Sequence, residues 1–178
     1  VVDVYLLKVD NTGSTSDLTT YTFSTRALGT AASNRRIVVG VGTRTAVTVS
    51  SMTIGGVAAA IASDGVTSAA IISGTSNRTE MWIADVPTGT TGDIVVTWSG
   101  ATSRCLIGVW ALYGAGSATI SNLQLPAANS DPSTASVTVP AKGVVVAYTA
   151  GNPAVSNTVT WDAGATERFD EIFEIVHS

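Results

Sequence analysis

Few residues in the chain have side chains suited to acid–base, nucleophilic or metal chemistry. The 178 residues include one histidine, His177, and one cysteine, Cys105. A catalytic histidine must be held between a nucleophile and an orienting acid, and terminal fraying at the penultimate residue opposes this. One Cys and one His are also too few for a zinc site of the usual Cys/His kind. We therefore predict no Ser-His-Asp, Cys-His or zinc chemistry, and no cofactor.

Cys105 opens the apolar run Cys105-Leu-Ile-Gly-Val-Trp110. This setting indicates a small buried hydrophobic side chain rather than a reactive thiol. Because no second cysteine is present, no intramolecular disulfide can form, and nothing in the cysteine content indicates an oxidising compartment.

Three carboxylates, Glu80, Asp85 and Asp93, are the candidates for a catalytic acid pair. Glycosidases set two carboxyl groups roughly 5 to 9 Å apart around the scissile bond. Asp85 and Asp93 instead flank the loop at residues 87–92, which is typical of solvated carboxylates at a loop rim. We expect no acid pair here and predict that the chain is not an enzyme.

A ligand or assembly surface is the remaining interpretation of the polar and aromatic residues, and its candidates are Trp82, Glu80 and Arg35. Alternation along a strand places Glu80 and Trp82 on the same face. An exposed face could bind a sugar by ring stacking. A buried face would make Trp82 part of the core, which is the commoner outcome for a Trp among Val, Ile and Leu.

The segment Asp10-Asn-Thr-Gly-Ser-Thr-Ser-Asp17 is rich in oxygen ligands and contains a glycine, as calcium loops do. It lacks regular ligand spacing and a terminal bidentate Glu. We therefore predict an ordinary polar turn and no metal site.

The charge content is low, with 12% Asp, Glu, Lys and Arg and a net charge of −4. Binding to phosphates requires clustered basic side chains, and the pair Arg35-Arg36 is too small a patch. We therefore expect neither nucleic-acid binding nor binding to a membrane surface. We also expect no membrane-spanning segment, because no apolar run approaches the ~18 residues of a membrane span. Residues 1–9 do not read as a signal peptide, and the first residue, Val1, suggests a processed or trimmed chain.

The composition favours strands over helices. Ser and Thr make up about a quarter of the residues, and β-branched Thr and Val suit a pleated, half-buried surface. Short apolar runs separated by turn residues predict about a dozen short strands. We expect an all-β fold, a two-layer antiparallel β-sandwich of the jelly-roll or immunoglobulin-like type. The strands expected before the long connection lie at residues 1–9, 21–23, 36–41, 46–54, 57–62, 79–86, 93–98 and 104–113.

Several turns and connections follow from the same pattern. Residues 11–17 should form a polar loop, and Gly55-Gly56 should form a tight hairpin turn, because glycine tolerates the positive φ required there. Residues 79–86 and 93–98 should form a strand pair. We expect one domain over residues 1–178, with a long surface connection near residues 114–136. The last strands should follow at residues 142–148, 158–161 and 166–176, with a helix over 169–176 as the alternative for the last of these.

Several segments together resemble β-sandwich virion structural proteins of tailed bacteriophages. The matching segments are Tyr21-Thr-Phe-Ser, Ser33-Asn-Arg-Arg-Ile-Val-Val39, Val49-Ser-Ser-Met-Thr-Ile-Gly-Gly-Val57, Glu80-Met-Trp-Ile-Ala-Asp-Val-Pro-Thr-Gly89 and Ala165-Thr-Glu-Arg-Phe-Asp170. The pattern is loose, covers roughly residues 20 to 170, and contains no invariant chemical motif. It leads us to expect a further strand or two beyond Ser178.

The resemblance implies a non-catalytic structural component of a bacteriophage virion, namely a capsid decoration or fibre protein exposed on the particle surface. The implied partners are other virion proteins, with a homo-oligomer and a host-surface glycan as further expectations. The alternatives are a carbohydrate-binding module and a bacterial adhesin-like β-sandwich domain.

Overall fold

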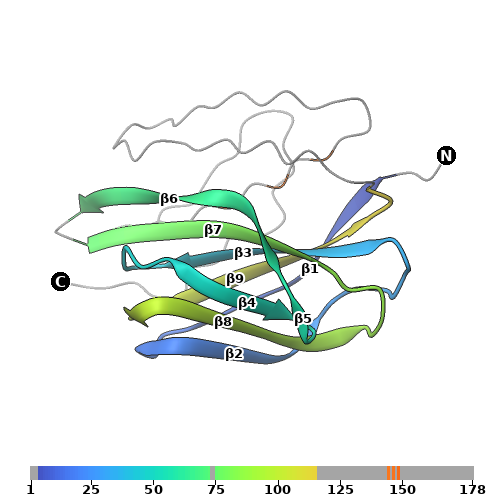
Figure 1. Ribbon diagram of the computed structural model, residues 1–178, viewed down its shortest axis with the longest axis horizontal. Helices are drawn as coiled ribbons and strands as arrows, with labels where there is room; N and C mark the ends of the chain where they lie inside the picture. Colours follow the sequence, from blue (N-terminus) through green and yellow to red (C-terminus); the bar gives the residue numbers. More distant parts are fainter. Residues whose placement is uncertain (1–3, 73–74, 116–143, 145, 147, 149–178) are drawn as a thin grey trace.

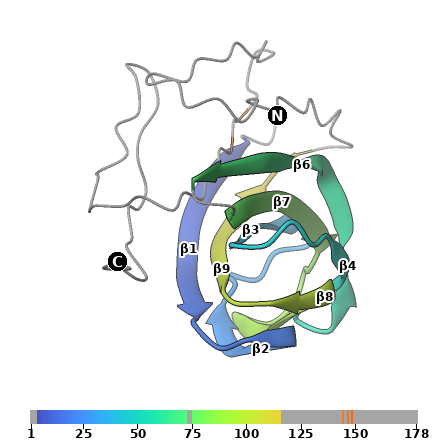
Figure 2. The same ribbon diagram turned by 90° about the vertical axis from the view of Figure 1, so that its left-hand side faces the viewer.

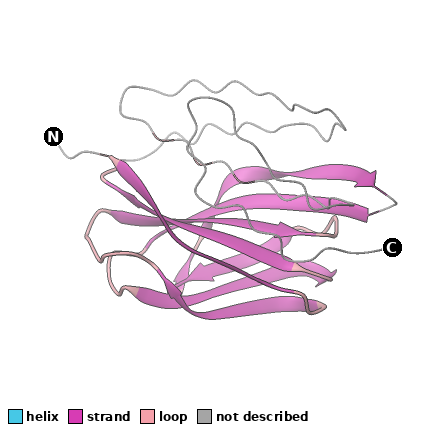
Figure 3. Cartoon of the chain, turned by 180° about the vertical axis from the view of Figure 1, so that it is seen from behind, coloured by secondary structure: helices cyan, strands magenta, loops and turns pink. Residues whose placement is uncertain are grey.

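A computed structural model describes residues 4–72 and 75–115 together with residues 144, 146 and 148. These residues contain no helix, and strands dominate the described chain (Figure 3). No described segment is therefore a helix that could cross a membrane. The strands are β1 (Tyr5–Ser14), β2 (Leu18–Ala27), β3 (Arg35–Thr43), β4 (Val49–Ile54), β5 (Val57–Ala58), β6 (Ala60–Ile72), β7 (Thr75–Asp85), β8 (Thr91–Thr102) and β9 (Cys105–Tyr113).

The strands form two antiparallel sheets that pack face to face (Figure 1). The five-stranded sheet has the order β1-β9-β3-β7-β6, and the four-stranded sheet has the order β2-β8-β4-β5. Seen from one end, the two sheets curve around a common interior (Figure 2). The predicted two-layer antiparallel β-sandwich is confirmed.

The strand pairing is nested, which distinguishes a jelly roll from an immunoglobulin-like sandwich. Among the described strands, the first pairs with the last (β1 with β9), the second with the eighth (β2 with β8), β3 with β7, and β4 with β5. This is the pattern of one long antiparallel hairpin rolled into two sheets, as in jelly rolls. An immunoglobulin sheet instead pairs the first two strands of the chain with each other. Strand β6 adds an outer strand to the five-stranded sheet beside β7.

The core lies between the sheets. Its buried apolar side chains come from the inward faces of both layers, including Val39 and Val41 of β3, Ile94 and Val96 of β8, and Trp98. Strand β3 is buried almost along its whole length, as its continuous apolar run at residues 36–41 predicts.

The first predicted loop is too long by four residues. Residues 11–14 continue β1 rather than forming a loop, because they pair with residues 105–108 of β9 along the sheet edge. Polar residues are compatible with an edge strand that is only half buried, so their composition resembled that of a loop. The Gly55-Gly56 turn is confirmed, with φ values of 58° and 80°.

Two strand assignments require correction at the level of pairing. The predicted strands at residues 79–86 and 93–98 exist as β7 and β8, but they lie in different sheets and do not pair. The returning strand at residues 57–62 is divided at Ala59: β5 pairs with β4, whereas β6 pairs with β7 in the opposite sheet. The chain therefore changes layers at Ala59.

A second apolar cluster lies on the outer face of the five-stranded sheet. It is centred on Val38, Trp110 and Leu112, and Val146 and Tyr148 pack against it. Most of the predicted long connection, His177 and the predicted strands at 158–161 and 166–176 lie outside the described residues, as does the predicted strand at 142–148 apart from its described positions.

Candidate functional site

Glu80 and Trp82 share the inward face of β7, as the alternation predicts, and both lie in the interior. Glu80 is 2% exposed and Trp82 is 8% exposed. The Glu80 carboxylate accepts hydrogen bonds from the Val49 backbone N–H at 3.0 Å, from Arg78 Nε at 2.5 Å and from Trp82 Nε1 at 2.9 Å. Because Val49 belongs to the facing sheet, this carboxylate joins the two layers. Its contacts are those of a structural ion pair.

Arg35, at the start of β3, is 1% exposed and lies against the loop between β7 and β8. Its guanidinium donates to the carbonyl oxygens of Val86, Gly29, Thr88 and Gly89 at 2.7 to 2.8 Å. These bonds fasten the connection after β2 to the loop after β7. The planar fork of donors in arginine suits such multiple bonding.

The expected ligand or assembly surface at Trp82, Glu80 and Arg35 is therefore not where these side chains lie. All three are buried within the chain, so a ligand on the surface of this structure does not reach them. The sequence pattern correctly placed Glu80 and Trp82 on one face, but it could not show that this face is covered by the second sheet. The other described tryptophans, Trp98 and Trp110, are buried as well.

The remaining carboxylate candidates have separate partners. The Asp85 carboxylate lies 2.8 Å from Arg36 Nε, directly across the β3–β7 pair. The Asp93 carboxylate accepts the Thr25 backbone N–H at 2.8 Å, where Thr25 has a positive φ of 56°. Each carboxylate thus stabilises a local backbone or strand contact.

Cys105 is fully buried, in agreement with its prediction as a core side chain. Burial raises the pKa of its thiol to about 12. A thiol is nucleophilic only as the thiolate, so this environment disfavours reactivity.

The segment at residues 10–17, which we predicted to be an ordinary polar turn, continues strand β1 at its start. Asp10 lies in β1, and its carboxylate accepts the backbone N–H groups of Asn11 at 2.8 Å and Ala27 at 2.9 Å. Within the described part of the chain no three acidic, cysteine or histidine side chains gather as metal ligands would.

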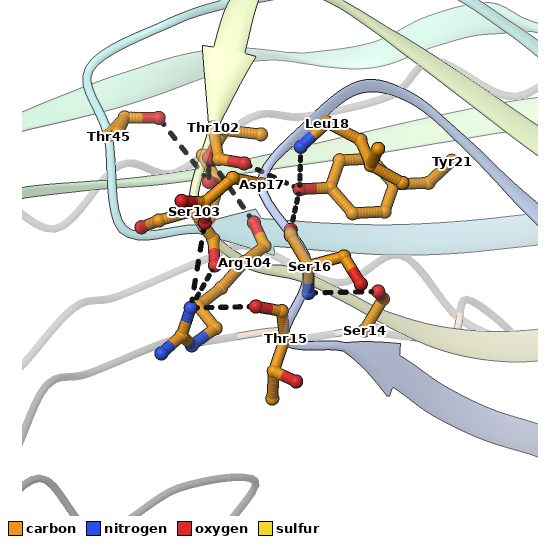
Figure 4. Close-up of polar contacts among 11 residues, drawn as sticks. Ser14, Thr15, Ser16, Asp17, Leu18, Tyr21, Thr45, Thr102, Ser103 and Arg104 are labelled. Carbon is orange, nitrogen blue, oxygen red and sulfur yellow. Dashed lines mark hydrogen bonds and ion pairs between the residues drawn. The ribbon is translucent and has the colours of Figure 1, made fainter.

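One end of the sandwich carries a cluster of polar contacts around Tyr21 and Arg104 (Figure 4). The Tyr21 hydroxyl lies 2.6 Å from the carbonyl oxygens of both Ser16 and Thr102, and it accepts the Leu18 N–H at 3.2 Å. Arg104 donates to the Thr15 carbonyl at 2.8 Å and lies 3.8 Å from the Asp17 carboxylate. These contacts hold the β1–β2 connection against the β8–β9 connection.

A concave depression of about 540 Å³ lies at the other end of the four-stranded sheet. Glycines line much of it, and Gly92 approaches Gly55 so closely that an added Cβ would lie 2.8 Å from the Gly55 Cα. Its side chains are apolar or hydroxyl-bearing, with the already engaged Asp93 as its carboxylate. The arrangement suits shape-matched contact better than bond-making chemistry.

The outward face of the four-stranded sheet, here called the hydroxyl face, has no charged side chain in its two central rows. Cross-strand pairing forms one row of Thr20, Thr97 and Ser51 and a second row of Thr22, Val95 and Thr53. Thr20, Thr22 and Ser51 are exposed, and the Thr20 and Thr97 hydroxyl oxygens lie 3.3 Å apart. This face presents hydroxyl and methyl groups to solvent.

A glycine notch occupies the outer face of the five-stranded sheet. Gly40 of β3 and Gly108 of β9 are direct cross-strand partners. The Tyr148 ring fills the space beside Gly40, where an added Cβ would lie 2.6 Å from Tyr148 Cγ. Tyr148 also packs edge-to-face on Trp110, with ring centroids 6.3 Å apart, and donates its hydroxyl to the Leu106 carbonyl at 3.3 Å.

Sequence reasoning missed the notch and the role of Tyr148. A signal was present, because Gly40 and Gly108 each interrupt a continuous apolar run. A glycine inside a strand often marks the close approach of another group. The identity of the approaching group could not be read from that signal.

Comparison of the chain with protein-family models, with curated proteins and with solved structures finds no match.

Proposed function

We propose that the chain is a non-catalytic structural component of a bacteriophage virion, a capsid decoration or fibre protein exposed on the particle surface. The observation that carries this proposal is the nested jelly-roll pairing of β1 with β9, β2 with β8 and β3 with β7. Viral capsid domains are among the main users of this architecture. Lectins and cupins also use it, so the surface chemistry must support the choice.

The use of the reactive side chains supports a structural role. Glu80 joins the two sheets, Asp10 and Asp93 accept backbone N–H groups, and Cys105 is buried with a raised pKa. Each of these groups stabilises the fold at its position.

The hydroxyl face supplies a surface suited to assembly. Its two central rows carry no charge and present short side chains from three neighbouring strands. Short side chains lose little conformational entropy on contact, which favours shape-matched packing against another protein. Weak contacts of this kind add up when many copies bind one symmetric particle.

The proposal is tested by co-sedimenting the purified chain with phage particles from the strain that carries its gene. Wild type should sediment with particles and saturate, and Thr22→Lys on the hydroxyl face should reduce the bound amount about tenfold or more, because it places an unpaired charge in the contact. Ala31→Lys, in the exposed connection after β2, is the matched control and should bind like wild type. Failure of wild type to sediment with any particle would refute the proposal.

The carbohydrate-binding alternative depended on an exposed Trp82. Since that ring is in the core, a glycan would need another platform. A polysaccharide pull-down that retained the chain, together with no particle binding, would favour this alternative.

A further inference from the structure

We propose that two copies of this chain pair through strand β2, antiparallel to each other, and so join their four-stranded sheets into one continuous sheet. This inference rests on the proposed function, because it states how neighbouring copies on a particle would be joined. The surface involved is the edge of the four-stranded sheet, which is distinct from the hydroxyl face.

Strand β2 forms one end of the four-stranded sheet, and among the described strands it pairs with β8 alone (Figure 1). Tyr21 and Phe23 point into the core, whereas the other side chains from Leu18 to Thr25 are exposed. The backbone N–H and C=O groups on the outer side of an edge strand can pair with a strand of another molecule. Strand β2 therefore offers a template for such pairing.

The composition of β2 distinguishes it from the other described edges. Natural edge strands are protected by charged side chains, by proline or by short length. Strand β5, at the other end of the same sheet, has only two residues, β1 carries Lys8 and Asp10, and β6 contains Asp64. Residues 18–25 of β2 are Leu-Thr-Thr-Tyr-Thr-Phe-Ser-Thr and contain no charge, proline or glycine. Because threonine and aromatic residues favour strands, this segment favours the addition of another strand.

The register of the pairing follows from the regular part of β2. Its pairing with β8 is regular from Thr20 to Phe23 and shifts on either side, where bulges bend the strand. Directly opposite residues of an antiparallel pair point to the same face, so a two-fold axis passes through a residue position rather than between two. An axis at Thr22 centres the pair on exposed hydroxyl side chains. It places the two Thr22 side chains opposite each other and Thr20 opposite Ser24 of the other copy.

The charges at the two ends of β2 favour the antiparallel orientation. Asp17 precedes the strand with a side chain that is 76% exposed, and Arg26 lies near the end of the strand. Antiparallel pairing brings Asp17 of one copy near Arg26 of the other, whereas parallel pairing brings like charges together. Within one copy each is only loosely paired, since Asp17 lies 3.8 Å from Arg104 and Arg26 lies 3.8 Å from Asp10. The neighbouring Asp93 carboxylate already accepts a backbone N–H.

A disulfide trap on the full chain tests the pairing. Thr22→Cys places two cysteines opposite each other at the axis, where Cα atoms of directly opposite residues lie about 4.5–5.5 Å apart, within the range of a disulfide. Ser51→Cys is the matched control, because Ser51 is exposed on the same hydroxyl face but lies in β4, two strands away from that edge. Wild type, whose Cys105 is buried, controls for unrelated cross-linking.

Mild oxidation should convert most of the Thr22→Cys chain to a covalent dimer on a non-reducing gel and leave Ser51→Cys monomeric, like wild type. Equal amounts of dimer from both variants would show that whole hydroxyl faces meet, and would overturn the pairing of edges. Absence of a dimer from Thr22→Cys would overturn it as well.

Sedimentation equilibrium gives a second readout without added cysteines. Wild type should dimerise as its concentration rises, and Asp17→Lys, which replaces attraction to Arg26 by repulsion, should raise the dissociation constant about fivefold. Asp85→Lys, at a similarly exposed carboxylate on β7, is the control and should dimerise like wild type. An unchanged dissociation constant in Asp17→Lys would contradict the antiparallel orientation.

Particle co-sedimentation is measured separately from dimer formation. A chain that binds particles without forming this dimer loses only this inference. A chain that dimerises through β2 without binding any particle loses only the proposed function.

Discussion

The two outer faces of the sandwich differ in chemistry although both belong to antiparallel sheets of one domain. The five-stranded sheet presents Val38, Trp110 and Leu112, and Tyr148 packs on this apolar cluster. The four-stranded sheet presents the hydroxyl face, whose threonines and serines remain largely exposed. One face is therefore covered by the chain's own residues, and the other is open to solvent.

The difference can be read along the strands. Strands β3 and β9 are apolar on both faces and are buried almost throughout, which requires a covering layer on each side. Strands β2, β4 and β8 alternate between buried and more exposed positions, which is typical of a sheet with one solvated face. The outer face of the first sheet is thus apolar and is covered in part by Val146 and Tyr148, whereas that of the second sheet is solvated.

The largest loss of stability is expected when a large side chain is removed from the apolar cluster on the covered face. Trp110→Ala should lower the free energy of unfolding by about 3–5 kcal/mol, because it removes a buried indole and leaves a cavity. Urea unfolding followed by circular dichroism measures this, with Trp110→Phe as the milder control. A loss below about 1 kcal/mol would show that the outer cluster is not packed in solution.

A smaller loss of unfolding free energy should follow when Tyr148, which covers the sheet, is replaced instead of a residue of the sheet itself. Tyr148→Ala should cost about 1–3 kcal/mol, since the ring is only half buried but fills the notch and packs on Trp110. The same unfolding measurement applies. Equal stability of Tyr148→Ala and wild type would remove the distinction between a covered and an open face.

Alkaline pH should destabilise the folded chain through the Tyr148 hydroxyl on the covered face. Burial raises the pKa of Tyr148 above its ordinary value of 10.0, so the unfolded state loses this proton before the folded state does. The stability that the protonated Tyr148 hydroxyl contributes to the folded state is fully present below pH 10.0. As the pH rises above this value, the free energy of unfolding falls by up to about 1.4 kcal/mol per pH unit. Tyr148→Phe should therefore lose less stability than wild type between pH 9 and 11. Identical slopes would indicate a hydroxyl exposed to solvent.

The smallest effect is expected on the hydroxyl face. Thr20→Ala and Thr22→Ala should each change the free energy of unfolding by less than about 0.5 kcal/mol, because both side chains are exposed. Their role, if the proposed function holds, appears in particle binding. A loss of about 2 kcal/mol from either change would mean that this face is also covered.

Much of the fold could be predicted from local patterns. The continuous apolar run of β3 indicated a strand buried on both faces, and Gly55-Gly56 indicated its turn, because both depend on neighbouring residues alone. The strand pairing could not be predicted in the same way. Strands β7 and β8 are adjacent in sequence but belong to different layers, since nested pairing depends on partners far away in the chain.

The site residues show the same limit. The alternation correctly placed Glu80 and Trp82 together, whereas the burial of that face follows from Val49 in the other sheet. Arginine is seldom fully buried, so Arg35 was expected at the surface. Its burial depends on four carbonyl oxygens that two loops bring together only in the folded chain.

The most direct test of a virion role is mass spectrometry of phage particles purified on a density gradient from the strain that carries the gene. We predict that peptides from this chain peak in the particle fraction and keep a constant ratio to the major capsid protein across it. Abundant capsid peptides without any from this chain would contradict the account.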